Sequence, residues 1–461
     1  MYFSSLLFIF VFLPVTLLGY YILPRKFRNV FLLLVNLIFY GWGEPVFILI
    51  MLVSIIVNYI CALLVEKDER RKKLYLIISL VISLGLLAVF KYTGFAVDML
   101  RALPPFAWMP KISIPLPIGI SFYTFQTLSY TIDVYRGDTK AQKSLVNLGT
   151  YISFFPQLIA GPIVRYRDIA LQLESRRETL SVFAEGVGIF LVGLAKKVLI
   201  ANQMGVLWDT LRETTGLGVL GSWIGIAAFS FQIYFDFSGY SDMAVGLGKM
   251  FGFEFMRNFE YPYISKSITE FWRRWHISLS TWFRDYVYIP LGGNRRSLAR
   301  VIFNLFAVWF LTGLWHGASF NFIAWGLYYF IFLVLEKYVY GKLLDKLPAV
   351  LKHVYALVII MVGWAIFYFE DFSALGAFIA GMFSPNGGII SSDALSTVLT
   401  YIPLLLTAAV ASLPWAKNLY MKNKDKKAVM ILETVFCAAV LILCTASLVN
   451  QSYNPFLYFR F

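Results

Sequence analysis

The chain has 461 residues, of which 59% are hydrophobic and only 14% are charged, and its mean hydropathy is +0.71. Soluble globular proteins carry about 25% charged residues, so this composition excludes an ordinary soluble domain and indicates a polytopic all-α membrane protein. The net charge of +14 would suggest nucleic acid in a soluble protein. Here the Lys and Arg residues cluster in short loops, so we expect contact with the lipid bilayer and no nucleic-acid partner.

The apolar runs predict about 11–13 membrane spans plus re-entrant or interfacial helices, because a helix needs ~20 apolar residues to cross the bilayer. The first run lacks the charged start and cleavage site of a signal peptide, so we expect it to be retained as a span. The run 145–163 is short and has basic flanks, which favours a re-entrant segment. One membrane-embedded domain over 1–461 is the simplest organisation. The predicted spans are 4–23, 29–43, 46–65, 74–93, 112–132, 180–207, 218–247, 300–316, 321–340, 353–369, 398–414 and 428–449.

The basic loops predict the orientation of the chain. By the positive-inside rule, segments rich in Lys and Arg face the cytoplasm. Counting spans from these loops places the N-terminus and the C-terminal tail, 451–461, outside the cell. The predicted cytoplasmic segments are 25–28, 66–73, 165–177, 248–300 and 422–427.

Two polar clusters interrupt the apolar runs before the 248–300 region. One holds Gln157 beside the Gly161-Pro162 break, and the other holds Asp236, Ser238 and Asp242. Either cluster could line a water-filled cavity or cap a helix end, and the sequence leaves both interpretations open.

The stretch 267–290 predicts one helix with an aromatic face and a basic face. Ser267 and Glu270 have capping-box spacing at its start, and Pro290 with the following glycines ends it. Such a helix lies in the membrane interface or dips into the bilayer, where aromatic and basic residues serve as anchors. The aromatic face, which also carries a histidine, consists of Trp272, Trp275, His276, Leu279, Trp282, Phe283 and Tyr286.

Anchoring does not explain His276, and a second histidine strengthens a functional interpretation. His316 lies about 15 residues into the apolar run that starts at Val301, or ~22 Å into a ~30 Å core. A titratable group at that depth indicates function, although a histidine that hydrogen-bonds across helices is the alternative. Gly313 and Gly317 flank it and permit close approach. A neutral imidazole is the usual general base for a thiol or hydroxyl, whereas His353, at a span start, is expected to be interfacial.

Two motifs together resemble the membrane-bound O-acyltransferase (MBOAT) family, and more closely its bacterial branch, typified by the alginate O-acetyltransferase membrane subunit. They are FWRRWHISLSTWFRDYVYIPLGGNR (271–295) and GLWHGASFNFIAWG (313–326). The resemblance extends over nearly the whole chain and includes 121–137, 154–163 and 232–253.

The resemblance implies a ring of tilted helices around a central funnel in the bacterial cytoplasmic membrane. His316 matches the catalytic histidine of the family and His276 its second histidine. The implied donor is a cytosolic acyl thioester, expected to be acetyl-CoA, with no bound cofactor or metal. The acyl group passes to an extracellular polysaccharide, usually through a membrane-anchored SGNH-type acyltransferase. The residues expected to line the donor funnel are Arg273, Arg274, Trp282, Arg284, Asp285 and Trp315.

Two other functions remain open. D-alanyl transfer to teichoic acids occurs in the same family, but the Pro290–Arg295 continuation favours acetyl transfer. A transporter or flippase belongs to a different class, and the lack of an inverted repeat and the paired histidines argue against it.

The C-terminal segment, NPFLYFRF (454–461), has two interpretations. It could be an aromatic belt after the last span. It also resembles the aromatic C-terminal motif of the small partner protein in D-alanylation systems. By that resemblance Tyr458 is a candidate acyl carrier on its phenolic oxygen, with His316 as base.

Overall fold

The computed structural model describes residues 1–384, 387–449 and 456–457, and every regular element assigned in these ranges is a helix. Eight of these helices are long and apolar enough to cross a membrane, and two shorter apolar helices cover Phe8–Ile22 and Phe372–Phe383. The all-α, multi-spanning fold class is therefore confirmed.

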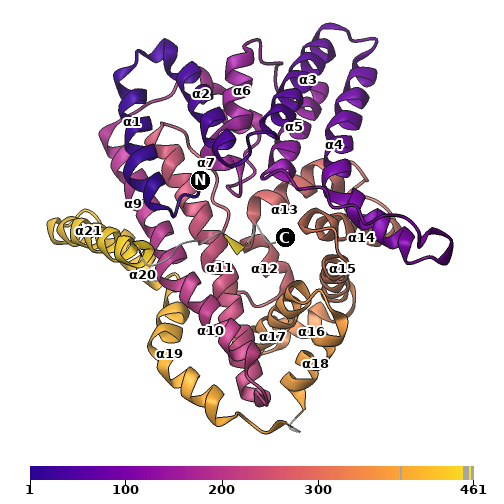
Figure 1. Cartoon of the computed structure of the whole chain (residues 1–461), viewed down its shortest axis with the longest axis vertical. Coiled ribbons are helices and arrows are strands. Elements are labelled where there is room, and N and C mark those ends of the chain that lie inside the picture. The colour runs from indigo at the N-terminus through magenta and orange to yellow at the C-terminus, as the bar shows by residue number, and fades with distance from the viewer. Residues whose placement is uncertain (385–386, 450–455, 458–461) are drawn as a thin grey trace. The chain divides into compact units, whose positions relative to one another are not determined.

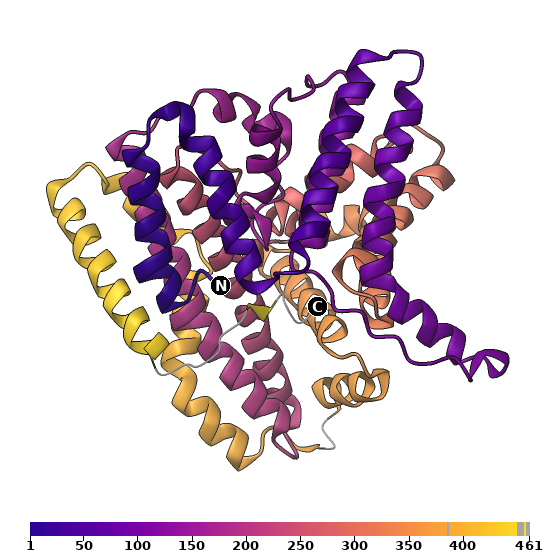
Figure 2. The same ribbon diagram turned by 45° about the horizontal axis from the view of Figure 1, so that its top comes forward.

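The chain divides into two compact units, residues 1–190 with 241–256 and residues 191–240 with 257–461. In the first unit α3, α4 and α5 lie side by side (Figures 1 and 2). The helices of this unit are α1 (Leu13–Ile22), α2 (Arg25–Gly43), α3 (Ile48–Lys67), α4 (Lys72–Arg101), α5 (Ile120–Arg136), α6 (Leu145–Ser153), α7 (Phe155–Leu158), α8 (Tyr166–Glu174) and most of α9 (Leu180–Ala195).

One buried amide ties α3, α4 and α5 together. The Asn58 side chain on α3 donates to the Ser83 hydroxyl and accepts from the Ser79 hydroxyl, both on α4. It also accepts from Thr131 on α5, at 2.9 Å. Interhelical polar bonds of this kind substitute for the hydrophobic effect where lipid surrounds the helices. The predicted span 112–132 begins later, at Ile120, because the preceding segment contains two prolines.

The 145–163 run forms two short buried helices, α6 and α7. Gln157 donates to the Tyr151 carbonyl at the end of α6, at 2.6 Å. Because this bond satisfies a helix end, the capping interpretation holds for Gln157.

Two of the predicted cytoplasmic loops meet at one carboxylate in the first unit. Glu178, with a side chain 4% exposed, accepts from Tyr20 at 2.8 Å and pairs with Arg28 at 2.7 Å. Arg176 lies 3.8 Å away. Burial alone would raise the pKa of Glu178, but these donors hold it below its usual value. The loops around residues 25–28 and 165–177 therefore lie on the same side of this unit, and their cytoplasmic orientation stays a prediction.

The second unit contains the functional candidates, and in it α14 packs on α15 and α15 on α17. A Cβ at Gly313 would lie 2.5 Å from the Phe322 carbonyl oxygen, so only glycine lets α14 and α15 approach so closely. The helices of this unit are α10 (Asn202–Glu213), α11 (Gly218–Met250, which continues into the first unit), α12 (Ile268–Arg274), α13 (Ile277–Phe283), α14 (Leu298–His316), α15 (Phe320–Leu335), α16 (Gly341–Lys346), α17 (Ala349–Tyr368), α18 (Phe372–Phe383), α19 (Ser392–Ala411), α20 (Trp415–Asn423) and α21 (Lys427–Val449).

The prediction of one continuous helix over 267–290 is wrong. The chain breaks after α12, where His276 adopts a left-handed conformation with φ 44° and ψ 55°. It resumes as α13 and ends in a π-helical turn at Arg284–Tyr288. The predicted N-cap is confirmed, because Ser267 accepts from the Glu270 N–H at 3.0 Å. The Glu270 carboxylate accepts from the Lys266 N–H instead of completing the box.

Candidate functional site

Asn258 creates the helix break and fixes His276 in it. The Asn258 carbonyl accepts from the Ile277 N–H at 2.9 Å, and its side-chain oxygen accepts from the Ser278 N–H at 3.1 Å. These bonds cap the start of α13. Left-handed backbone costs a non-glycine residue about 1–2 kcal/mol, and such strain concentrates at functional positions.

The same oxygen determines which nitrogen of His276 carries the proton. Asn258 Oδ1 lies 3.2 Å from His276 Nδ1, and a backbone N–H already identifies this atom as an acceptor. Nδ1 must therefore donate, which leaves a lone pair on Nε2. Nε2 is buried and makes no hydrogen bond within the described part of the chain. Burial lowers the pKa of His276, which lies outside the eight long apolar helices, to about 3, so the ring is neutral.

His276 lines a cavity of about 230 Å³, which we call the larger cavity. Its walls are mainly aromatic and aliphatic, and two exposed arginines, Arg273 and Arg284, also line it. A neutral imidazole in the wall and cations at the exposed positions suit a polar ligand with an anionic end. The lining residues are Thr269, Trp272, Arg273, His276, Leu279, Ser280, Phe283, Arg284, Tyr288, Leu305, Val308, Trp309, Thr312 and Leu333.

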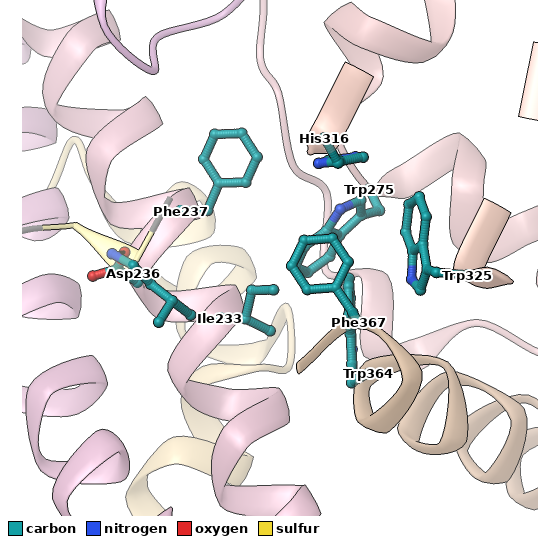
Figure 3. A pocket seen from close by; sticks show the side chains of 9 residues that line it. Ile233, Asp236, Phe237, Trp275, His316, Trp325, Trp364 and Phe367 are labelled. Atoms are coloured by element: carbon teal, nitrogen blue, oxygen red, sulfur yellow. Dashed lines mark hydrogen bonds between the residues drawn. The ribbon is translucent and has the colours of Figure 1, made fainter. Parts of the chain in front are cut away.

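His316 lies at the last position of α14 and lines a different cavity, which we call the smaller cavity (Figure 3). Its ring lies 4.9 Å from the Trp325 ring and 5.3 Å from the Phe367 ring. The cavity holds about 20 Å³, room for about one water molecule. Figure 3 shows Asp236 and Ile233 across the space from these aromatic side chains. The lining residues are Ile233, Asp236, Phe237, Trp275, His316, Trp325, Trp364, Phe367 and Leu457.

Trp315 connects the two histidines. Its ring centroid lies 5.8 Å from that of His276 and 5.0 Å from that of His316. The two imidazoles are therefore neighbours of one indole ring, while each lines its own cavity. The sequence could not predict this arrangement, because it joins residues that are 40 positions apart.

Comparison with known proteins identifies the family. The sequence profile of the MBOAT, membrane-bound O-acyltransferase family, matches residues 138–369. The chain is 40% identical to a probable alginate O-acetylase of Azotobacter vinelandii over the full length of both proteins. The chain belongs to the MBOAT family. The predicted resemblance is confirmed, and the protein is an O-acyltransferase.

Two further relatives perform related transfers, by their names. A peptidoglycan O-acetyltransferase of Helicobacter pylori is 34% identical over 84% of this chain and 80% of its own length. A teichoic acid D-alanyltransferase of Bacillus subtilis is 31% identical over 47% of this chain and 58% of its own length.

The predicted donor-funnel residues of this O-acyltransferase separate into two groups. Arg273 and Arg284 line the larger cavity. Arg274 instead pairs with Glu270 at 2.9 Å, and Asp285 pairs with Arg284 at 2.8 Å. Trp282 is buried against the rings of Phe283 and Tyr286 and lines neither cavity. Tyr458 lies outside the described residues.

A buried carboxylate from another helix supports α12. Glu336 accepts from the Ile268 N–H at 2.6 Å and from the Thr269 N–H at 2.9 Å. It therefore satisfies two orphan donors at the start of α12 and complements the positive end of that helix. No local pattern predicts this contact, because Glu336 is 67 positions from Thr269.

The three polar residues of the 235–253 cluster lie in different surroundings. Asp236 lies in the middle of α11, so it caps no helix end, and it lines the smaller cavity. Ser238 and Asp242 line neither cavity. Asp236 pairs with Lys197 in the second unit. Sequence reasoning missed Lys197, although a lysine within the predicted span 180–207 was a usable signal.

Proposed function

We propose that this O-acyltransferase takes an acetyl group from acetyl-CoA on the cytoplasmic side and delivers it for O-acetylation of a cell-envelope polysaccharide outside. The observation that carries the proposal is the pair of imidazoles, each in its own cavity and both against Trp315. Relatives named as an alginate O-acetylase and a peptidoglycan O-acetyltransferase support a polysaccharide acceptor and an acetyl group.

The larger cavity is the proposed donor site. Arg273 and Arg284 would bind the phosphates of the coenzyme through charge-assisted hydrogen bonds. The thioester would then lie deeper, near Nε2 of His276. We assign His276 an orienting role, because Asn258 holds its ring rigidly and burial keeps it neutral.

His316, which lines the smaller cavity and shares Trp315 as a neighbour with His276, is the proposed base for the transfer. His316 would take the phenolic proton of Tyr458 while the phenolic oxygen attacks the thioester carbonyl carbon. The new C–O bond forms, the C–S bond breaks, and the coenzyme leaves as a thiol with that proton. Leu457, the neighbour of Tyr458 in sequence, lines the cavity of His316, which supports this assignment.

The acetyl-tyrosine would then serve a second transfer outside. An SGNH-type partner anchored in the same bacterial cytoplasmic membrane would accept the acetyl group and pass it to a polysaccharide hydroxyl. A phenol is a better leaving group than an alkoxide, so the tyrosine ester would release its acetyl group readily.

Tyr458→Phe tests this route, because it keeps the ring and removes only the oxygen. The variant should insert normally, bind acetyl-CoA and fail to support polymer acetylation. Peptide mass spectrometry of the wild-type protein after exposure to acetyl-CoA should find an acetyl group on the C-terminal peptide, and Tyr453→Phe is the matched control. A fully active Tyr458→Phe enzyme would reduce the tail to a membrane anchor.

D-alanyl transfer is the second candidate, supported by the Bacillus subtilis relative. It would require a carrier-bound D-alanyl thioester instead of free acetyl-CoA. Incubation of the purified protein with each radiolabelled donor separates the two: the proposal predicts label transfer from acetyl-CoA, and label transfer only from charged carrier protein would replace it.

The proposal requires the 248–300 region to face the cytoplasm and both termini to face outward. Ser297 is exposed at the start of α14, so Ser297→Cys should leave activity unchanged. In intact cells this cysteine should react with a membrane-permeant maleimide and not with an impermeant one. Reaction with the impermeant reagent would show that the predicted orientation is wrong.

A further inference from the structure

A buried ion pair in the second unit contacts the end of the chain. Lys197 lies in the π-helical segment Lys196–Ala201 that follows α9, and Asp236 lies on α11. Their side chains are only 4% and 3% exposed. A Cβ at Gly239 would lie 2.7 Å from the Gly193 carbonyl oxygen, so this glycine permits the close approach that joins the two segments.

The pair is an expensive way to join two helices. Removing two charges from water costs several kcal/mol per ion, and apolar side chains of similar size often stabilise a protein as well or better. A buried carboxylate and ammonium inside a membrane protein therefore indicate a purpose beyond packing.

The second carboxylate oxygen of Asp236 binds the C-terminal tail. Oδ1 pairs with Lys197, and Oδ2 accepts from the backbone N–H of Leu457 at 2.8 Å. A carboxylate that accepts from a backbone N–H makes a charge-assisted hydrogen bond, stronger than a neutral one. Because the donor is backbone, the bond fixes the register of the tail whatever the side chain at 457.

The neighbouring residue of the tail is recognised by its ring. The Phe456 ring lies 4.3 Å from that of Tyr240, edge to face at 88°. The Lys197 ammonium lies 4.9 Å from the Phe456 centroid, which is cation–π geometry. Phe456 and Leu457 are 1% and 6% exposed. Lys197 thus contacts both the carboxylate that holds position 457 and the ring at position 456.

We propose that Lys197, Asp236 and Tyr240 form a seat for the chain's own tail, which fixes Leu457 at the smaller cavity of His316. Lys197 and Asp236 are positioning residues: they act by holding the tail, not by contact with the donor. The inference deepens the proposed function and rests on it for the role of Tyr458, but the seat itself is measurable without any acyl transfer.

Cysteine protection in the full-length chain tests the seat. In a Leu457→Cys protein the new thiol should be shielded. Its maleimide labelling, followed by mass spectrometry of the C-terminal peptide, should be at least ~10-fold slower than the labelling of the exposed thiol in a Ser297→Cys protein. Adding Asp236→Asn should raise the labelling rate of position 457 about 10-fold or more, whereas Asp242→Asn on the same helix should leave it unchanged.

Asp236→Asn leaves Lys197 uncompensated and could destabilise the protein, so a second variant is needed. Lys197→Met with Asp236→Leu removes both charges and keeps the volume, which is the tolerated way to delete a buried pair. Combined with Leu457→Cys, it should purify and melt like the parent and still expose the thiol at position 457. Protection that survives in this folded variant, or a thiol at 457 that already labels rapidly in the Leu457→Cys parent, would overturn the seat.

Activity then separates this inference from the proposed function. In both seat variants polymer acetylation should fall at least ~10-fold while the KM for acetyl-CoA stays unchanged, because the donor cavity is elsewhere. If the thiol at position 457 becomes reactive as expected but Tyr458→Phe is fully active, the seat stands and the acyl-carrier role fails. If that thiol stays protected while Tyr458→Phe is inactive, the carrier stands and the seat fails.

Discussion

The two histidine cavities differ in how their imidazoles are held. Asn258 fixes the ring, tautomer and strained backbone of His276, and the larger cavity beside it has exposed cations. His316 ends a helix among aromatic rings, and the small cavity beside it has a carboxylate and a residue of the tail. The difference teaches that the two histidines need not play the same part. A fixed ring suits orientation of a bound donor, and the ring beside the tail suits proton transfer.

Removal of either imidazole should have the largest effect on activity, and the two losses should differ. His316→Ala should lower polymer acetylation by about 10³-fold or more, since a positioned general base contributes about 10²–10⁴-fold. His276→Ala should cost about 10–100-fold, because it removes orientation rather than proton transfer. Steady-state acetylation by membranes with matched protein levels measures both.

His353→Ala provides the control, since His353 lines neither cavity, and it should be fully active. If His276→Ala proved the more damaging change, the two roles would have to be exchanged.

Asn258→Asp should change how the reaction rate depends on pH, which tests whether His276 must be neutral. In the wild type burial holds the pKa of His276 at about 3, so its ring stays neutral and should contribute no acidic limb to the rate profile above about pH 5. A carboxylate beside Nδ1 favours the imidazolium and raises this pKa. The variant should therefore lose activity, by about 10-fold at pH 6, and regain part of it as the pH rises. A pH–rate profile with unchanged shape would show that His276 need not be neutral.

Arg273→Ala should have the smallest of these effects, and the effect should be on the binding of acetyl-CoA. Loss of one charge-assisted phosphate contact costs about 1.5–3 kcal/mol. Because Arg273 is exposed, we expect the low end of that range, which raises the KM for acetyl-CoA about 10-fold and changes kcat little. Arg274→Ala is the matched control, because Arg274 pairs with Glu270 and lines neither cavity. Equal KM values for the two variants would remove the larger cavity from the donor site.

The sequence allowed the fold class and the family to be predicted and singled out both histidines as candidates, because apolar runs and rare residues in an apolar context are local signals. It misled at residues 275–276, where helical periodicity continued across the break. The cause is Asn258, which caps α13 from 18–20 positions upstream, and no periodicity reports such a contact. Lys197 was different: a charge within an apolar run was visible, and only its partner Asp236 and the tail residue that the pair holds required the structure.

The amide of Asn58 has a consequence for biogenesis. A polar side chain that enters lipid without a partner costs several kcal/mol, and helices insert in chain order before they assemble. Asn58 meets Ser79 and Ser83 on α4, the helix that follows its own, whereas Thr131 arrives only with α5. An α3–α4 hairpin can thus leave the translocon with its amide already bonded, and α5 then joins a helical pair that offers it a ready acceptor.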